Sequence, residues 1–296
     1  MELRRWLLLA AGLLAGCGQL QPKETLKHER VPDMAETYWQ STGSTVFANG
    51  ANWSGGVPGV GDVAVFDGRS QVDAAGSDQS GGGLLTAIRI QREYQGSIGT
   101  AGNPLVIPVS KVDHLGTGQV CIYLSAANLP DVSVDSGHSL QFPALRWTGY
   151  NPQRLDILRG KVWYDPTLGD ETAKVTLIGG RLYATATSKR ISLLLVVGGV
   201  AETNYKVTST HVLGGTIKAS GTTYSNVRIQ RGEFIALDDL SHTGYVWAIG
   251  GTYDITRCTA SHSLTYFSVY PEGDFVYNQD SYGAITTIRD LRNEFP

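Results

Sequence analysis

A glycine recurs in one small frame nine times between Gly118 and Gly273. Apolar or small residues tend to lie five and three positions before it, and two and four positions after it. Alternate residues of a β-strand point to one face, so each unit offers four inward side chains around a glycine that suits a bend. The glycines, spaced 16 to 23 residues apart, are Gly118, Gly137, Gly160, Gly180, Gly199, Gly215, Gly232, Gly251 and Gly273.

A repeat of this length with period-2 hydrophobicity indicates stacked β coils. We therefore predict an all-β chain that forms a single-stranded parallel β-helix of nine to ten coils. Right-handed winding is expected, because coils of 16–23 residues do not fit the strict hexapeptide rhythm of left-handed helices. The alternative is an antiparallel sandwich, which the scarcity of Asn-Gly and Asp-Gly turns within the repeat disfavours.

The frame fits well around Gly160, where Leu155, Ile157, Val162 and Tyr164 are predicted to point inward. Asp113 interrupts the frame before Gly118, and the trailing half after Gly137 slips by one residue. Ile88 and Ile90 indicate an earlier coil that lacks its glycine. In the two less regular units the predicted inward residues are Leu115, Val120 and Ile122, and then Val132, Val134, Leu140 and Phe142. The unit of Gly273 fits the frame and predicts Ser268, Tyr270, Phe275 and Tyr277 as inward residues.

The charge pattern excludes one broad class of function. Charged residues make up only 17% of the chain, the net charge is −3, and Lys and Arg are scattered. Nucleic-acid-binding proteins carry a basic patch or stripe, so no nucleic-acid partner is expected. The sequence has no P-loop, HExxH motif or nucleophile elbow, and no metal site or cofactor is predicted.

The first 17 residues have the pattern of a secretion signal. Arg4 and Arg5 precede an apolar run that is too short to span a bilayer. The closing Leu-Ala-Gly-Cys resembles the bacterial lipoprotein box, which implies a lipid on Cys17 and a membrane-anchored place on the cell surface. Residues 18–37 then form a tether. The alternative is a start at Met34, which removes the secretion argument and leaves a virion structural protein.

Residues 38–84 are predicted to form an N-terminal cap over the open end of the β-helix, which spans residues 85–280. The segment contains Trp39, Asn52-Trp53-Ser54-Gly55-Gly56-Val57-Pro58 and Phe66. It resembles the opening of bacterial surface and autotransporter-type proteins and of some phage structural proteins. Its tryptophans are expected to cover the core, or alternatively to bind sugar.

Residues 281–296 are expected to cap the other end with a short, helical, charged tail carrying Ile285, Ile288 and Leu291. Beyond Cys17, the chain has Cys121 and Cys258. Seven coils would separate these two by about 30 Å, whereas a disulfide needs Cα atoms within about 7 Å. Two unpaired, buried or half-buried thiols are therefore predicted.

Two outward columns follow the repeated glycine, at one and three positions after it. They predict Trp163 beside Tyr183, Lys161 beside Arg181, and Glu202 beside Lys218. Such pairs are commonly ordinary ladder contacts worth a few tenths to about 1 kcal/mol. The functional interpretation is a ligand-binding platform in which Trp163 and Tyr183 stack on a sugar, and Lys161 and Arg181 face its anionic groups.

Carboxylates on the same columns allow a catalytic hypothesis. β-Helix lyases and glycosidases cluster carboxylates on one outer face, and resemblance to them makes Glu233 and Asp254 candidate acids or bases. A loop cluster adds Asp238, Asp239 and His242. No third stacked carboxylate completes a metal site, and acidic residues in loops are usually solvated, so an enzyme is the less favoured class.

An apolar column lies two positions before the glycine, where strict alternation points outward. Either a bend turns it inward, or it packs against copies of the chain, as in the trimeric β-helix stems of phage fibres that it resembles. The homotrimer hypothesis uses Leu158, Ile178, Val197, Leu213 and Ile249.

The expected function is a structural or adhesive rod on a cell surface or virion, which presents a face to surface polysaccharide or another partner. The alternative is a polysaccharide lyase or glycoside hydrolase.

Overall fold

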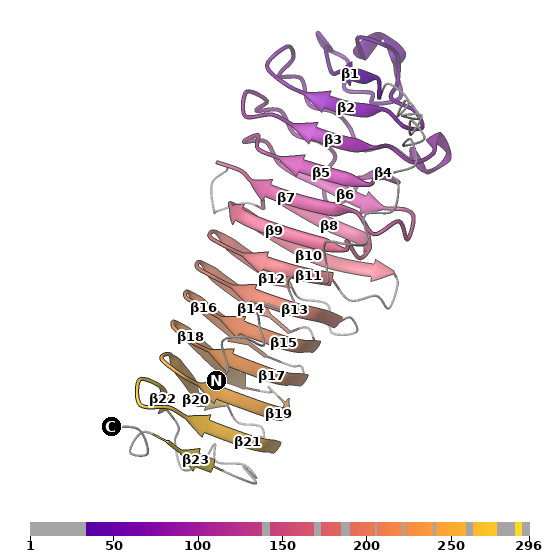
Figure 1. The fold of residues 1–296 in the computed structure, drawn as a ribbon. Coiled ribbons are helices and arrows are strands. Elements are labelled where there is room, and N and C mark those ends of the chain that lie inside the picture. The colour runs from indigo at the N-terminus through magenta and orange to yellow at the C-terminus, as the bar shows by residue number, and fades with distance from the viewer. Residues whose placement is uncertain are drawn as a thin grey trace, which may run out of the picture. The chain divides into compact units, whose positions relative to one another are not determined.

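The computed structural model describes residues 34–137, 143–168, 173–184, 190–204, 206–220, 223–238, 241–258, 263–276 and 288–291. All strands of this described part belong to the unit Ala35–Pro296. They form two parallel sheets of 13 and 10 strands, which we call sheet A and sheet B (Figure 1). Every pairing between named strands is parallel, so the predicted parallel β-helix is confirmed and the sandwich is wrong.

Sheet A contains, in spatial order, β1 (Glu36–Tyr38), β2 (Val63–Phe66), β3 (Ala87–Ile90), β5 (Lys111–His114), β7 (Asp131–Asp135), β9 (Arg154–Arg159), β11 (Ala173–Leu177), β13 (Arg190–Val196), β15 (Lys206–Val212), β17 (Thr223–Ile229), β19 (Ser241–Ala248), β21 (Ser263–Val269) and β23 (Ile288–Asp290). Sheet B contains β4 (Leu105–Ile107), β6 (Val120–Leu124), β8 (Leu145–Tyr150), β10 (Lys161–Leu168), β12 (Arg181–Ala184), β14 (Val200–Thr203), β16 (Thr216–Ala219), β18 (Glu233–Asp238), β20 (Thr252–Cys258) and β22 (Asp274–Val276). Two 3₁₀ helices, η1 (Gly50–Asn52) and η2 (Ser80–Gly82), lie between the first strands.

About seven coils carry the repeated glycine between their two strands, from the coil of β9 and β10 to that of β21 and β22. The prediction of nine to ten also counted the units of Gly118 and Gly137. Those units lie in the less regular N-terminal part, where five residues separate β5 from β6 and residues 138–142 lie outside the described part. Leu140 and Phe142 are therefore not described, and the sheet B strand that follows is β8.

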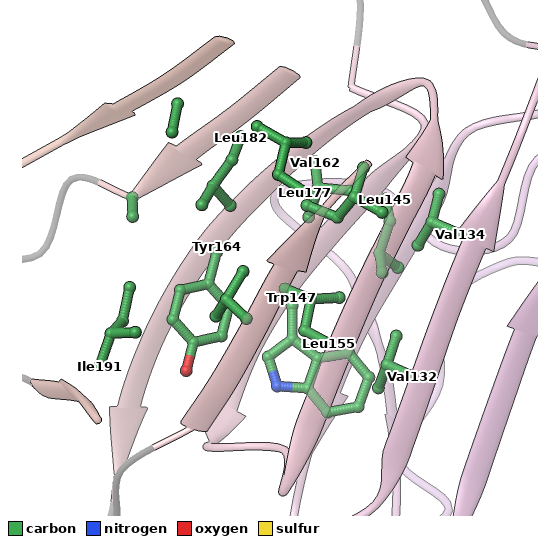
Figure 2. Packing of buried hydrophobic residues seen from close by; sticks show 14 of the residues in the cluster. Val132, Val134, Leu145, Trp147, Leu155, Val162, Tyr164, Leu177, Leu182 and Ile191 are labelled. Carbon is green, nitrogen blue, oxygen red and sulfur yellow. The ribbon is translucent and has the colours of Figure 1, made fainter. Parts of the chain in front are cut away.

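The core is a stack of aliphatic and aromatic side chains enclosed between the two sheets (Figure 2). Around Gly160, the four predicted inward residues are all buried. Each is paired with the equivalent position of the next coil, so that Leu155 aligns with Val175 and Val162 with Leu182. Burying one such side chain is worth about 1.5–3 kcal/mol before the entropy of ordering the chain is subtracted.

The repeated glycine is required by both conformation and space. Gly215 has a φ of +73°, and a Cβ there would lie 2.5 Å from the carbonyl oxygen of Gly199 in the previous coil. That carbonyl accepts the N–H of Thr216 at 2.9 Å, which holds the coils together at the bend. The preceding Gly214 is equally confined, because its Cβ would lie 2.5 Å from the oxygen of Val197. The close approach explains why several units carry two glycines.

Two predicted frames are wrong in register. In β5, Val112 and His114 point into the core, whereas Asp113 points outward and pairs with Lys111 at 2.8 Å. Leu115 is only partly buried. The buried His114 places its Nε2 3.2 Å from the carbonyl oxygen of Ala144, so it occupies a core position that the apolar frame did not anticipate.

The other shift occurs near the end of the repeat. Phe267 and Val269 align with Val246 and Ala248 and fill the core, in place of the predicted Ser268 and Tyr270. Phe275 aligns with Tyr253 as predicted. The turn that precedes Gly273 is therefore one residue longer than in the earlier coils, which moves the leading strand by one position and exchanges its two faces.

The N-terminal segment combines an aromatic cluster with the first strands of sheet A. Trp39 and Trp53 are buried, with ring centroids 5.1 Å apart, and both pack on Phe66. Their indole N–H groups donate to backbone carbonyls, each at 2.8 Å. Because both rings are buried, the alternative that they form a sugar-binding pair is wrong. Parallel pairing already begins at β1, ahead of the predicted cap.

The C-terminal tail extends the sheet. The expectation of a short helix is wrong for Ile288–Asp290, which forms β23 and pairs with β21, followed by the buried Leu291. Ile285 lies outside the described residues. Cys121 is a buried free thiol, as predicted, and burial raises its pKa to about 11. The side chain of Cys258 lies outside the described part.

Candidate functional site

The predicted aromatic ladder lies on the outer face of sheet B. Lys161 pairs with Arg181, and Trp163 pairs with Tyr183, across neighbouring strands β10 and β12. The Trp163 and Tyr183 rings are stacked, with centroids 6.2 Å apart and an interplanar angle of 25°. The prediction that the repeat places these four residues together is confirmed, and their binding of a ligand stays a prediction.

Three cations surround the two rings. The Lys161 ammonium lies 4.6 Å from the Tyr183 ring centroid, and Arg181 donates a weak hydrogen bond of 3.4 Å to the Tyr183 hydroxyl. The third cation, Arg146, lies over Trp163 at 5.3 Å. Arg146 was missed because the frame around Gly137 slipped. The sequence signal that could have found it is the alternation of apolar Leu145 and Trp147 with polar Arg146 and Thr148, which predicts an outward Arg146.

The geometry limits what this ladder can offer a ligand. β8 and β12 flank β10 on opposite sides, so one face of the Trp163 ring meets Arg146 and the other meets Tyr183. The indole Nε1 is buried and has no hydrogen-bond partner among the described residues. The ladder therefore presents charged head groups and ring edges, and we call Arg146, Lys161, Trp163, Arg181 and Tyr183 the cationic ridge.

A small polar hollow adjoins the ridge. Glu202 lies 3.9 Å from Lys218 on the neighbouring rung, which confirms their predicted proximity. Side chains exposed to this degree give a pair worth at most about 1 kcal/mol. The hollow has a volume of about 180 Å³ and is lined in part by Tyr183, Glu202 and Asn204. The Asn204 Oδ1 atom is buried and lacks a partner within the described part of the chain.

The candidate catalytic carboxylates lie further along the same face. Glu233 pairs with Thr252 and Ile235 pairs with Asp254, so Glu233 and Asp254 are diagonal neighbours on β18 and β20. Asp254 Oδ1 accepts hydrogen bonds from the N–H and hydroxyl of Thr256, at 2.8 and 2.7 Å. Within the described residues, no three metal-ligating side chains cluster. The prediction of a loop is wrong for Asp238, which ends β18, and for His242, which lies in β19. The side chains of these two residues, and Asp239 as a whole, lie outside the described part.

A larger hollow on the outer face of sheet A was missed by the sequence analysis. It has a volume of about 650 Å³ and spans strands β15, β17 and β19. Two aromatic residues dominate one side: Tyr245 and Trp247 have ring centroids 5.6 Å apart and an interplanar angle of 14°. We call it the sheet A hollow, and its lining is Ser209, Thr210, His211, Asn226, Arg228, Tyr245, Trp247, Ile249 and Tyr270.

A sequence signal for this hollow did exist. Tyr245 and Trp247 alternate with Val246 and Ala248, the inward residues of the Gly251 unit, so both had to point outward. The predicted ligand-binding residues belong to the two columns after the glycine, which lie on sheet B. The columns before it lie on sheet A.

The apolar column before the glycine points outward. Leu158, Ile178, Val197 and Leu213 are 37%, 49%, 42% and 36% exposed, so the explanation of an inward bend is wrong for them. The reason is the continued ladder: the Ile178 N–H donates to the Ile157 carbonyl at 2.8 Å, and alternation therefore carries on to the glycine. Gln230 interrupts the stripe, and Ile249, partly buried, lines the sheet A hollow.

Comparison with protein-family models finds no match, and neither the curated proteins nor the solved structures yield one. Cys17 lies outside the described residues. In the part that is described, no helix is long and apolar enough to cross a membrane. Function therefore has to be inferred from the two outer faces themselves.

Proposed function

We propose that this chain is a structural or adhesive β-solenoid that binds an anionic surface polysaccharide through the cationic ridge of sheet B. The observation that carries the proposal is the gathering of Arg146, Lys161 and Arg181 around one aromatic pair on three successive rungs. Charge-assisted hydrogen bonds from such cations to carboxylate or sulfate groups are roughly twice as strong as neutral ones.

The ridge is suited to a repeating ligand because its residues are fixed in advance. Each side chain belongs to a strand paired on both sides, and the rings and cations hold one another in place. A preorganised surface loses less entropy on binding than mobile loops do. The rungs follow one another at about 4.8 Å, so a linear polymer lying along the sheet meets a new rung with each short step.

Binding measurements with the double variant Lys161→Gln/Arg181→Gln test the proposal. Titration calorimetry with polygalacturonate should show an affinity at least about tenfold below that of the wild type, and the wild-type affinity should fall as salt rises. The matched control is Lys174→Gln/Arg190→Gln, which removes two exposed cations of sheet A. Equal loss in both variants, or none in the first, would refute a role for the ridge.

The competing proposal is a polysaccharide lyase or hydrolase, and the place of Glu233 and Asp254 on the same face as the ridge favours it. Under the adhesive proposal, incubation with polygalacturonate leaves the polymer length unchanged, as size-exclusion chromatography would reveal. Depolymerisation that the Glu233→Gln/Asp254→Asn variant abolishes, with binding retained, would establish the enzyme instead.

We further propose that the stripe of Leu158, Ile178, Val197 and Leu213 is a contact surface between copies of the chain, arranged as a trimer. The stripe is uncharged, and each rung adds one aliphatic side chain to a straight line, so an identical stripe matches it along its whole length. Light scattering should find the Ile178→Glu/Leu213→Glu variant monomeric and the wild type trimeric. The same mass for both proteins would exclude this contact.

The place of the protein in the cell follows as a proposal of the same kind. A lipid on Cys17 would anchor the solenoid at a cell surface, whereas a chain starting at Met34 would suit a virion component. Mass analysis of the mature N-terminus distinguishes the two, since only the first carries a lipidated cysteine.

A further inference from the structure

We propose that the sheet A hollow is a second ligand site, which binds a pyranose unit carrying an anionic group. The hollow arises because the outward side chains of sheet A become larger from β15 to β19. Ser209, Asn226 and Tyr245 form one column, and His211, Arg228 and Trp247 form the next. The large rings of β19 make a wall above the shorter side chains of β15, and the space of about 650 Å³ lies between them.

The apolar part of the lining matches one side of a sugar ring. Tyr245 and Trp247 lie nearly parallel, and the pocket continues over Ile249 and Tyr270. Tyr245 is 43% exposed, so part of its ring is accessible to a ligand. Aromatic rings of this kind, apolar in body and polar at one end, commonly build binding sites. The C–H face of a pyranose can pack on them.

The polar part of the lining matches the other side of such a unit. The Asn226 amide and the Ser209 hydroxyl can each both donate to and accept from sugar hydroxyls. Arg228 is exposed, and a guanidinium binds a carboxylate through two parallel hydrogen bonds. No carboxylate stands among the described residues that line the hollow, and His211 adds a further donor. The site therefore favours an anionic sugar over a neutral one.

The hollow is independent of the cationic ridge. The two sheets enclose the core between them, so the ridge and the hollow lie on the outer faces of different sheets. A solenoid with both sites could hold two polymer chains at once, and such multivalency raises avidity without any new contact. The inference does not require the ridge to bind anything.

The experiment measures binding of short oligosaccharides to the Lys161→Gln/Arg181→Gln protein, which lacks two of the three cations of the ridge. Calorimetry with a tetra-uronate, a sulfated tetrasaccharide and a neutral tetrasaccharide of equal length defines the preference. The anionic probes should bind at least about tenfold more tightly than the neutral one. Arg228→Gln should abolish this preference, Trp247→Ala should weaken all three probes by at least about tenfold, and Trp247→Phe should restore much of the loss.

Folding of each variant is checked by urea denaturation, and Tyr123→Ala serves as the matched loss of a partly buried aromatic residue on the other sheet, outside the ridge. Unchanged affinities in folded Arg228→Gln and Trp247→Ala would overturn the proposal. So would a Trp247→Ala protein whose mass by light scattering falls while its sugar binding stays the same, since the hollow would then be a contact between copies. If Lys161→Gln/Arg181→Gln leaves the binding of polygalacturonate unchanged, the proposal for the ridge fails, but the effects of Arg228→Gln and Trp247→Ala still test the sheet A hollow.

Discussion

Replacing Gly215 by alanine tests the structural basis of the repeat. Two costs apply to this position. An L-residue held at a φ of +73° costs about 1–2 kcal/mol. The new Cβ would also lie 2.5 Å from the Gly199 carbonyl oxygen, and relieving such overpacking typically costs about 1–3 kcal/mol. We expect a combined loss of about 2–5 kcal/mol in the free energy of unfolding.

Three other glycines separate the two costs. Gly214 has the same 2.5 Å approach, to the Val197 oxygen, without a positive φ, so its alanine variant should show the overpacking cost alone. Gly56 has a φ of +88° and open space, and its variant should show only the conformational cost. Gly43 has neither constraint, so Gly43→Ala should be neutral or stabilising by up to about 1 kcal/mol.

Urea denaturation followed by far-ultraviolet circular dichroism provides the assay. With a slope near 3 kcal/mol/M, Gly215→Ala should move the midpoint down by roughly 1 M. Because each coil of a solenoid contacts only its neighbours, the transition of this variant should also broaden. A midpoint within error of the wild type, or a larger loss in Gly43→Ala, would show that the bend tolerates a side chain and that the reasoning is wrong.

Three further predictions concern single side chains. Trp39→Ala should lower the free energy of unfolding by about 3–5 kcal/mol, because it removes a buried ring that packs on Trp53 and Phe66. Thermal unfolding would measure this loss, and a value below about 1 kcal/mol would contradict the prediction. Cys121, with its pKa raised by burial to about 11, should react with iodoacetamide at pH 8 about a hundredfold more slowly in the folded chain than in urea, as site-resolved mass spectrometry would show. The hydrogen bond from Arg159 lowers the pKa of Asp135 below its ordinary 3.8. The carboxylate therefore stabilises the fold above that value, and this contribution is lost as pH falls through the folded pKa. Asp135→Asn should flatten the dependence of the free energy of unfolding on pH in acid, and an unchanged slope below pH 4 would contradict the ion pair.

The regular coils were predictable because their information is local. Period-2 alternation assigns each residue to the core or the surface, and the repeated glycine marks the bend where one strand ends and the next begins. In a parallel stack with a constant frame, equal positions in successive coils are neighbours. Trp163 beside Tyr183 and Glu202 beside Lys218 follow from that rule alone.

The frame failed where the connection between strands changed length. Five residues join β5 to β6, and the turn before Gly273 holds one extra residue, so the inward positions moved to His114, Phe267 and Val269. A strand that slips by one residue exchanges all of its inward and outward side chains. The alternation within a single strand does not report the length of the turn that follows it in the same coil.

The amino-acid sequence by itself determined the class of fold, the bend at the repeated glycine and the core of the regular coils, because each depends on residues a few positions apart. Only the tertiary structure decided that Arg146 covers Trp163, that the stripe of Leu158 and Leu213 faces outward, and that a hollow opens beside Trp247. Those features depend on the register between rungs about 20 residues apart and on differences in side-chain size from one rung to the next. Surfaces that meet a ligand are built from such differences, whereas the repeat is built from what stays the same.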